Sequence, residues 1–499
     1  MFSQAFKSNM NQFNLNNNSV SFCFSKADYY PNKAPYHPDE KYPEILGTEL
    51  DSENGIYECV RNTLISLRMD FEHIGTKKWN PFQKIIKPGM TVFIKPNTCT
   101  HEHLLNKDIF SAIIHASVLR PILDYVCIAL NNDGKIIIGD SQLIYADYQN
   151  AMEQSGINAL LEWYRKRTPV QIECLDLRTV RTVRSWLYGR WKHQKINNDK
   201  SGYEYVDLKK ESCFNNIDPL KLRVAIASYK EMQKHHTYEK HEYLIPKSLL
   251  KSDVVISIPK LKTHRRTAVT LALKNFMGIS AGKDCIPHFQ TGSVKEGGDQ
   301  YINPSIRKRI GTHLHDIVQS SPYIPVKFVA AILKKLIWNS SRIIPFKDDV
   351  FEAMWYGNDT VWRTLHDLNR IVFFADKNGK MSNSQQRGFF CLIDGIIAGE
   401  KDGPLSPDPV NTGVILAGFN PFAIDTIAST LMGFDYKKIP LIMNGLNKGH
   451  NGTSLFKGTE DDILVCEKNE RYNIQDLLHK KCFRFEPHPN WKGYVELNN

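Results

Sequence analysis

A mostly apolar run at residues 253–258 (DVVISI) restricts the fold of this chain more than any other stretch. Val and Ile without alternating polar residues are typical of a strand buried on both faces, as found in parallel sheets covered by helices. Similar runs recur at residues 90–94 (MTVFI), 135–139 (KIIIG) and 170–177 (VQIECLDL), and helical patterns alternate with them. We therefore predict an α/β fold with a largely parallel, helix-covered sheet.

The length of 499 residues is more than one ordinary hydrophobic core accommodates, so we expect two lobes with insertions. Residues 1–45 are rich in Asn, Ser, Tyr and Pro, and we interpret them as a flexible N-terminal lead-in on the surface. The α/β domain would span residues 46–460, with insertions at about 178–245 and 282–350. Residues 461–499 would form a C-terminal extension.

Charge and cysteine content narrow the functional class. The 64 Lys and Arg residues exceed the 53 Asp and Glu residues, which suits a small anionic substrate. No dense basic run indicates nucleic acid as a partner. Ten cysteines occur without a C-x-x-C pair, so we expect no iron–sulfur cluster and no zinc ribbon, but reduced thiols. Without an apolar leader or a transmembrane run, we expect a cytoplasmic protein; its oligomeric state stays open.

Polar residues follow each predicted strand. Because the carboxyl ends of parallel strands lie at one edge of a sheet, we expect these residues to form one site. The segment at residues 267–279 (TAVTLALKNFMGI) reads as a buried helix that follows a cationic turn and carries two further polar residues. The strand-end groups are Lys95 with Asn97, Asp140 with Ser141, Lys260 with Lys262 and His264, Asp394 with Gly395, and Gly418 through Asn420.

The residue types at this edge suit an enzyme that acts on a phosphorylated or carboxylated substrate. Lysines provide point charges for such anions, and His264 or His288 could transfer protons. We predict His264, Lys262 and Asp394 as catalytic residues. The predicted substrate-binding residues are Lys95, Asn97, Asp140, Ser141, Lys260, Lys274, Asn275 and Arg363. Arg363 lies four positions before Asp367, so the two could simply pair on a helix.

Two other functions remain open at this point. His264, Asp284, His288 and Asp299 could bind a divalent metal, although their spacing matches no standard zinc signature. Alternatively, the chain could be a non-catalytic partner in a larger assembly, using the aromatic-rich segment at residues 351–376. The amphipathic, basic pattern at residues 326–338 (VKFVAAILKKLIW) fits either packing on its own domain or peripheral contact with a membrane.

Several motifs occur in an order that resembles the domain-of-unknown-function-362 (DUF362) family. They are K-P-N (95–97), G-D-S (139–141), P-K-L-K-T-H (259–264), A-L-K-N-F-M-G (272–278), D-G-I (394–396) and N-P-F-A-I-D-T-I-A-S-T-L-M-G (420–433). The resemblance runs from about Val92 to Phe434 and is similar to a long-form branch without the ferredoxin appendage of some relatives. The family's name records that its activity was not established when it was defined. Long-branch members are often associated with bacterial surface-polysaccharide genes, which suggests that pathway.

Overall fold

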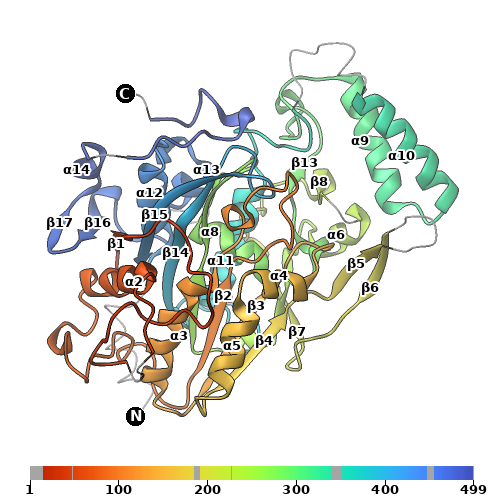
Figure 1. Ribbon diagram of the computed structural model, residues 1–499. Coiled ribbons are helices and arrows are strands. Elements are labelled where there is room, and N and C mark those ends of the chain that lie inside the picture. Colours follow the sequence, from red (N-terminus) through yellow and green to blue (C-terminus); the bar gives the residue numbers. More distant parts are fainter. Residues whose placement is uncertain are drawn as a thin grey trace.

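The computed structural model describes residues 15–45, 47, 49–184, 191–225, 228–339, 350–446, 455–480 and 482–497. Eleven strands of these residues form one twisted sheet through the middle of the molecule (Figure 1). Nine of them lie side by side in the order β17 (Glu470–Tyr472), β16 (Leu464–Glu467), β1 (Ser19–Phe24), β15 (Asp408–Gly418), β14 (Gly388–Glu400), β10 (Val254–Ile258), β2 (Thr91–Pro96), β3 (Lys135–Asp140) and β4 (Gln171–Asp176).

The five strands from β14 to β4 run parallel to one another, which confirms the predicted α/β fold. Strand β15 is antiparallel to β14 and pairs its last residue, Gly418, with Cys391 near the start of β14. The prediction that residues 418–420 join the other strand ends is therefore wrong, because β15 ends at the opposite edge of the sheet. Strand β14 also continues beyond Asp394, where we expected it to stop, with a register shift between Gly395 and Ile397.

Helices cover both faces of the sheet, and each face has its own hydrophobic core. Alternate residues of the strands divide between them: Val92 and Ile136 pack on one face, and Phe93 and Ile137 on the other. The first face is covered by α2 (Gly55–Ser66), α3 (Ala116–Leu130), α4 (Tyr148–Gln154) and α5 (Ile157–Arg165). The second is covered by α8 (Ala272–Asn275), α11 (Val361–Phe374), α12 (Pro421–Leu431) and α13 (Pro440–Leu446).

Strands from the N-terminal and C-terminal regions that the structure describes are part of the sheet. Strand β1 lies between β15 and β16, although we predicted a surface lead-in for residues 1–45. Its side chains alternate, with Val20 and Phe22 buried in the core. Strands β16 and β17, together with α14 (Ile474–Leu478), come from the predicted C-terminal extension. Residues 1–14 are outside the described part of the chain.

The segment after β10 differs from the predicted turn and helix. Residues 260–264 form β11 (Lys260–His264), which pairs in parallel with β14, and β12 (Ala268–Thr270) returns antiparallel to it. Only α8 follows, four residues long, before a 3₁₀ turn at Phe276–Ile279. Asp425 of α12 explains this tight start, because its carboxylate accepts hydrogen bonds from the backbone N–H groups of Ala272 and Leu273.

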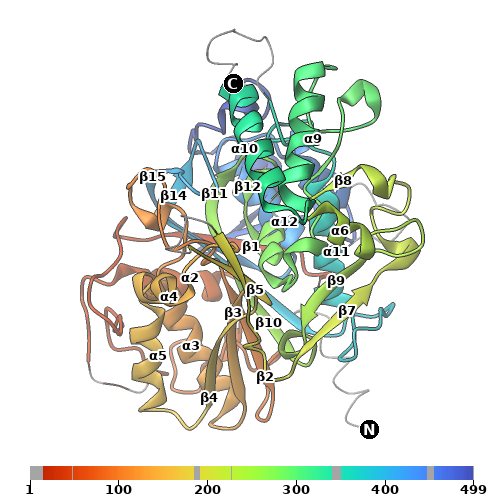
Figure 2. The same cartoon turned by 90° about the vertical axis from the view of Figure 1, so that its right-hand side faces the viewer.

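The remaining elements lie in the two regions predicted as insertions, except α7, which follows the first of them. Three two-stranded ribbons are β5 (Val180–Arg184) with β6 (Trp191–Lys195), β7 (Tyr203–Asp207) with β9 (Glu242–Pro246), and β8 (Leu222–Arg223) with β13 (Phe289–Gln290). The helices are α6 (Tyr229–His235), α7 (Lys247–Leu250), α9 (Ile306–Ser320) and α10 (Ile324–Asn339). Figure 2 shows α9 and α10 side by side at the edge of the molecule. Among the described residues, no helix has both the length and the apolarity needed to cross a bilayer.

Candidate functional site

Three parallel strands bring polar groups to one edge of the sheet. Lys95 is near the end of β2, Asp140 ends β3, and β10 lies beside β2 and is followed by the segment that contains α8. The strands are buried in the core through runs of Val and Ile. The polar residues at the end of each strand therefore have defined positions. The structure therefore places the predicted residues of β2 and β3 against the segment around α8.

A cavity of about 110 Å³ lies at this edge. It contains seven of the predicted site residues and several that the sequence did not single out. Its lining consists of Lys95, Asn97, Cys99, Asp140, Ser141, Leu143, Lys262, Thr270, Lys274, Asn275, Met277, Gly278, Lys283, Pro404 and Leu405. Four of these residues are lysines and one is a carboxylate, and we call this set the lysine cavity.

Lys95 and Asp140 form a buried ion pair in the lysine cavity, with 2.8 Å between Lys95 Nζ and Asp140 Oδ1. Lys95 Nζ also donates to the Pro96 carbonyl at 2.6 Å, and the other oxygen of Asp140 accepts from the backbone N–H and the hydroxyl of Thr98. The amide of Asn275 donates to the Lys95 carbonyl at 2.9 Å. The ammonium of Lys95 is thus almost fully occupied by partners within the protein.

Gly278 makes this arrangement possible. A Cβ at this position would lie 2.3 Å from Asp140 Oδ1 and 2.7 Å from Lys95 Nζ, so any side chain there would displace the ion pair. The Gly278 carbonyl accepts from the Ser141 backbone N–H at 2.7 Å, and the Ser141 hydroxyl donates to the Ser280 carbonyl. The segment after α8 is therefore fastened directly to the end of β3.

The other three lysines of the cavity differ in how many partners they have. Lys262 Nζ donates to the carbonyls of Ala112 at 2.5 Å and Pro404 at 3.1 Å. Lys283 Nζ donates to the Ser141 carbonyl at 2.6 Å. The ammonium of Lys274 makes no hydrogen bond or ion pair with any residue that the structure describes. The number of ammonium hydrogens without an acceptor in the protein therefore rises from Lys262 to Lys283 and again to Lys274.

Burial and mutual repulsion weaken the protonation of two of these amines. Burial, with the nearby charge of Lys262 as the next cause, lowers the pKa of Lys274 to about 7. Burial also lowers the pKa of Lys283 to about 7, and Asp140 partly offsets that effect. Two buried polar oxygens of the lining, Asn97 Oδ1 and Thr270 Oγ1, have no partner among the described residues. Such groups usually bind a ligand or ordered water.

Lys260 and Asp394 are adjacent to each other but do not line the lysine cavity. Lys260 Nζ lies 3.0 Å from Asp394 Oδ2 and donates to the Tyr30 hydroxyl at 2.6 Å, which in turn donates to Asp394 Oδ1 at 2.6 Å. The side chains of both charged residues are fully buried. We call Lys260, Asp394 and Tyr30 the closed triad. Because the charges of Lys260 and Asp394 balance and Tyr30 hydrogen-bonds to both, the geometry of the triad is that of a structural contact.

The predicted histidine and arginine roles are not supported by their positions. His264 is buried, and its Nδ1 accepts hydrogen bonds from the Arg266 backbone N–H and is 3.0 Å from the Thr267 hydroxyl. Burial lowers its pKa well below the usual range. Arg363 pairs with Asp359 and not with Asp367, whose carboxylate accepts from Ser212, Tyr243 and the Cys213 backbone. None of these residues lines the lysine cavity.

The proposed metal ligands are not brought together. Asp299 accepts hydrogen bonds from the Gln290 backbone N–H and the Thr360 hydroxyl, both at 2.6 Å, and so organises its own loop. His288 Nδ1 lies 2.7 Å from the Ile286 carbonyl, and burial lowers its pKa to about 3. In the part of the chain that the structure describes, no three His, Cys, Asp or Glu residues form a group that could hold a metal ion. His264, Asp284, His288 and Asp299 therefore do not form such a group in the structure.

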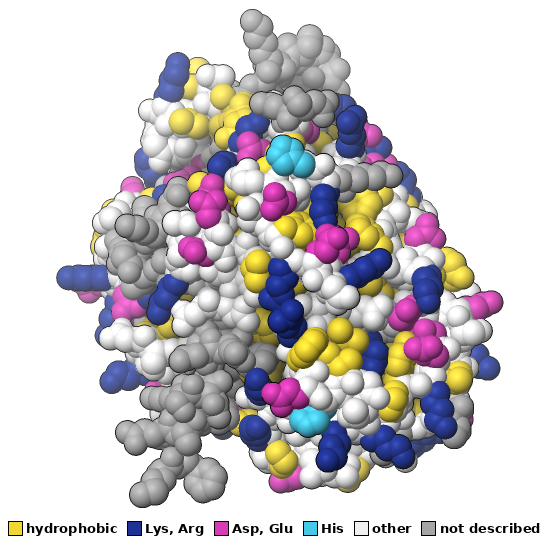
Figure 3. Space-filling model, turned by 90° about the vertical axis from the view of Figure 1, so that its left-hand side faces the viewer, with side chains coloured by type: hydrophobic (Ala, Val, Ile, Leu, Met, Phe, Trp, Pro, Cys, Tyr) yellow, Lys and Arg dark blue, Asp and Glu magenta, His cyan; other side chains and the backbone are white. Residues whose placement is uncertain are grey.

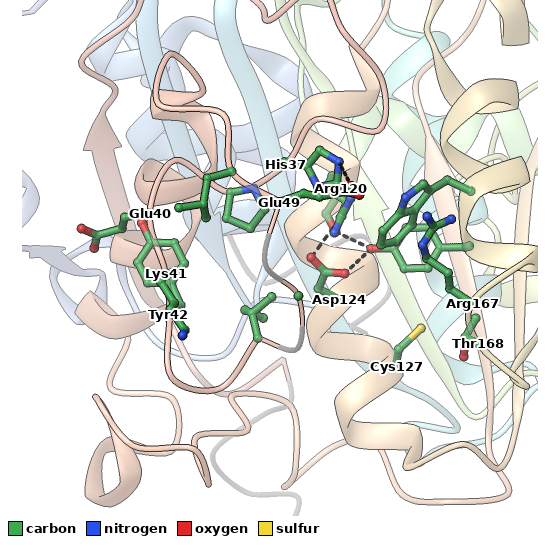
Figure 4. A pocket seen from close by; sticks show the side chains of 16 residues that line it. His37, Glu40, Lys41, Tyr42, Glu49, Arg120, Asp124, Cys127, Arg167 and Thr168 are labelled. Atoms are coloured by element: carbon green, nitrogen blue, oxygen red, sulfur yellow. Dashed lines mark hydrogen bonds and ion pairs between the residues drawn. The ribbon is translucent and has the colours of Figure 1, made fainter.

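A larger hollow of about 350 Å³ lies between the segment at residues 37–50 and helices α3 and α5 (Figure 4). Its cations are Lys41, Arg120 and Arg167, and its carboxylates are Glu40, Glu49 and Asp124. Arg120 Nε lies 2.9 Å from Asp124 Oδ2, and the guanidinium lies 4.1 Å above the Trp163 ring. With three cations against three carboxylates, this hollow has no charge preference like that of the lysine cavity.

Sequence reasoning missed Tyr30, Gly278 and Lys283. Tyr30 lies in the stretch that we took for a lead-in, and nothing near it in the sequence indicates its partner, which is 364 positions away. Lys283 follows Gly282 in a polar loop and has no distinguishing pattern. Gly278 was quoted within a motif, where a glycine between apolar residues could have indicated a close approach.

A family model described as "Domain of unknown function (DUF362)" matches residues 200–430. The K-P-N and G-D-S motifs lie outside this range, although the structure packs both against it. No curated protein matches the chain. A solved structure of a Thermotoga maritima protein from the Northeast Structural Genomics Consortium is similar at 11% identity, with a TM-score of 0.31 over 77% of this chain. The matched region covers 59% of that protein's length.

Proposed function

We propose that this chain, whose residues 200–430 match the DUF362 model, is an enzyme acting on a small phosphorylated or carboxylated substrate at the lysine cavity. One observation carries the proposal. Four lysines surround a space in which the single carboxylate, Asp140, is already paired with Lys95. An anion is the ligand that this surplus of positive charge would attract.

The energetics favour a bound anion. Bringing amines together away from water disfavours their charged forms, as the lowered pKa values of Lys274 and Lys283 indicate. A phosphate or carboxylate would reverse this effect and supply acceptors for their unused hydrogens. It would also lie near the unpartnered oxygens of Asn97 and Thr270, which a protonated oxygen or a bridging water could satisfy.

The size of the cavity limits what it can enclose. At about 110 Å³ it offers several times the roughly 30 Å³ that one water occupies in the liquid. That is room for a phosphate or carboxylate group but not for a whole sugar phosphate. A larger substrate would place its anionic end here and extend outwards.

The lysines would have different roles. Lys274 and Lys283 have the most unused N–H donors and would contact the anion directly. Lys262 would help through its charge, and Lys95, held by Asp140, would shape the cavity. Because the pKa of Lys274 is lowered to about 7, its amine could accept and return a proton near neutral pH. Lys274 therefore replaces His264 in the proposed acid–base role.

Calorimetric titration with inorganic phosphate and with acetate tests anion binding. Lys274→Met and Lys283→Met should each weaken binding by about 10-fold or more, since a hydrogen bond to a charged group contributes roughly 1.5–3 kcal/mol. Lys377→Met is the matched control, because Lys377 is an exposed lysine remote from the cavity lining. Equal binding by all four proteins would contradict the proposal.

Turnover needs a separate test. Phosphorylated sugars incubated with the protein can be followed by phosphorus NMR, and Lys274→Met should abolish any conversion that the wild type and Lys377→Met retain.

A place in surface-polysaccharide assembly and a cytoplasmic location both remain parts of this proposal. They are supported only by the family resemblance and by the ten free cysteines.

A further inference from the structure

Helices α9 and α10 form a hairpin that stands away from the main body of the molecule (Figures 1 and 2). The two helices pack on each other through one side of α10, where Ala330 is buried and Lys327, Lys334 and Ile337 are half-buried. At 100° per residue, these four positions fall within an arc of about 80°. The rest of α10 faces away from α9.

The outward side of α10 is apolar almost throughout. At 100° per residue, the exposed residues Ile324 to Leu336 cover an arc of about 200° that is interrupted by one charged residue, Lys335. The large hydrophobic side chains of the hairpin that are between 45% and 77% exposed are Ile306, Ile310, Tyr323, Ile324, Val326, Phe328, Val329, Ile332, Leu333 and Leu336. Soluble monomers rarely leave so many neighbouring large apolar groups in water.

Other parts of the surface are different. Figure 3 shows the side of the molecule that is on the left in Figure 1, where Lys, Arg, Asp and Glu are interspersed among small hydrophobic groups. The pattern of α10, with Lys327 and Lys334 toward its neighbour and apolar groups outward, differs from that face. It is the arrangement expected of a surface whose normal surroundings are not water.

The charges of the hairpin indicate which surroundings these are. Helix α10 contains Lys327, Lys334 and Lys335 and no Asp or Glu. Lys327 and Lys335 make no ion pair with any described residue, while Lys334 contacts His315 and lies 3.7 Å from Glu352. Helix α9 begins with Arg307, Lys308 and Arg309, of which Lys308 is buried and Arg309 pairs with Glu296. Apolar side chains flanked by lysines and arginines are typical of helices that lie in the interface of an anionic bilayer.

We propose that the α9–α10 hairpin docks the protein on a membrane surface containing anionic lipid, with the apolar arc of α10 in the acyl boundary and its lysines among the headgroups. The width of that arc favours lipid over a second protein copy, because a helix pairing with one partner needs a stripe of only about 100°. Sixteen residues extend about 24 Å, short of the roughly 30 Å bilayer core, so α10 lies in the interface. This docking is independent of the anion proposed for the lysine cavity.

Vesicle sedimentation with the full-length protein tests the proposal. Phosphatidylcholine vesicles containing phosphatidylglycerol should bind the wild type, and pure phosphatidylcholine vesicles should bind it about 10-fold less or more weakly still. Phe328→Ser combined with Leu336→Ser should reduce binding at least about 10-fold. Both side chains are more than 60% exposed, so the double variant should fold normally, as circular dichroism can verify.

Matched variants distinguish binding through the hairpin from non-specific binding through other exposed hydrophobic residues. Leu105→Ser combined with Leu220→Ser removes two side chains of similar exposure outside the hairpin and should leave binding unchanged. Lys335→Glu should weaken binding to the anionic vesicles, whereas Lys377→Glu should not. Equal binding to both vesicle types, or unchanged binding of the Phe328 and Leu336 variant, would overturn the proposal. So would a wild-type dimer that does not bind vesicles and that the same variant converts to monomer.

Discussion

The closed triad and the lysine cavity place lysines at the same edge of the sheet in opposite electrostatic situations. Lys260 and Lys262 are two residues apart on β11, yet a register shift against β14 directs them to different environments. Lys260 meets Asp394 and Tyr30, and the side chains of Lys260 and Asp394 are fully buried. Lys262 joins three other lysines around a cavity with one carboxylate. A buried lysine is thus structural where its charge is balanced.

The comparison separates two meanings of a lowered lysine pKa. Burial lowers the pKa of Lys260, but Asp394 opposes that effect at direct contact. Burial also lowers the pKa of Lys274, and there the next cause is another lysine, which adds to the effect. The charge of Lys260 is thus balanced within the fold. The repulsion on Lys274 is relieved only if an amine loses its proton or an anion binds. The four predictions below test this distinction.

Lys260→Met should have the largest effect. It leaves the Asp394 carboxylate fully buried without its counter-charge, and breaking a buried ion pair in this way costs about 3–5 kcal/mol of unfolding free energy. Lys274→Met should lower stability by less than about 1 kcal/mol, or raise it, because Lys274 has no partner to abandon. Urea unfolding of both variants measures the difference, and equal losses would remove the distinction between the two centres.

Gly278→Ala should cost about 2–3 kcal/mol and should also weaken phosphate binding. The new methyl group would overlap Asp140 Oδ1 and Lys95 Nζ, neither of which can move without breaking other hydrogen bonds. Gly311→Ala is the control, since a Cβ there meets its nearest atom at 3.4 Å, an ordinary contact. Urea unfolding and calorimetry would contradict the prediction if the two alanine variants behaved alike.

Tyr30→Phe should have a smaller effect on the closed triad. It removes a hydroxyl that accepts from Lys260 and donates to Asp394, while the direct ion pair at 3.0 Å remains. We expect a loss of about 1–2 kcal/mol in urea unfolding, with phosphate affinity unchanged. Tyr29→Phe alters the neighbouring, half-exposed tyrosine and should leave stability unchanged. A loss of phosphate binding in Tyr30→Phe would mean that the closed triad contributes to the lysine cavity, which would contradict their separate roles.

The parts of the site that sequence predicts are those attached to strongly patterned strands. Runs such as KIIIG fix β3, and with it Asp140 and Ser141, while the same reasoning on β2 locates Lys95 and Asn97. Local pattern also indicated Lys274 and Asn275, as charged or polar residues in an apolar segment, although that segment is a strand and a short helix and not one helix. Seven of the cavity residues were predicted in this way.

The remaining features depend on long-range packing that local pattern does not encode. Whether β15 runs parallel or antiparallel to β14 decides if residues 418–420 reach the site, and the strand's composition is the same in both cases. Tyr30 meets Asp394 only because β1 enters the sheet beside β15. The alternation of Val20 and Phe22 could have predicted β1, but its surroundings suggested a disordered lead-in. Charge balance, which separates the two lysine centres, becomes visible only in three dimensions.

The last expected effect is a dependence of stability on pH to which Lys274 and Lys283 of the lysine cavity contribute. Lys274 and Lys283 titrate near pH 7 in the folded protein and near 10.5 when unfolded. Between these values the unfolded chain binds more protons, so stability should rise with pH in this window and the penalty should be complete below it. Anion affinity should fall over the same range, because the neutral amines no longer attract the ligand.

Comparison of urea unfolding at about pH 7 and about pH 9 isolates this contribution. The variant with both Lys274→Met and Lys283→Met should lose the rise in unfolding free energy that the wild type shows over this interval. Asp425 works in the opposite direction, since burial raises its pKa to about 8, but it is present in both proteins and cancels in the difference. Saturating phosphate should flatten the wild-type curve, because a bound anion keeps both amines protonated. An identical pH profile in the two proteins would mean that the cavity lysines are as well compensated as Lys260.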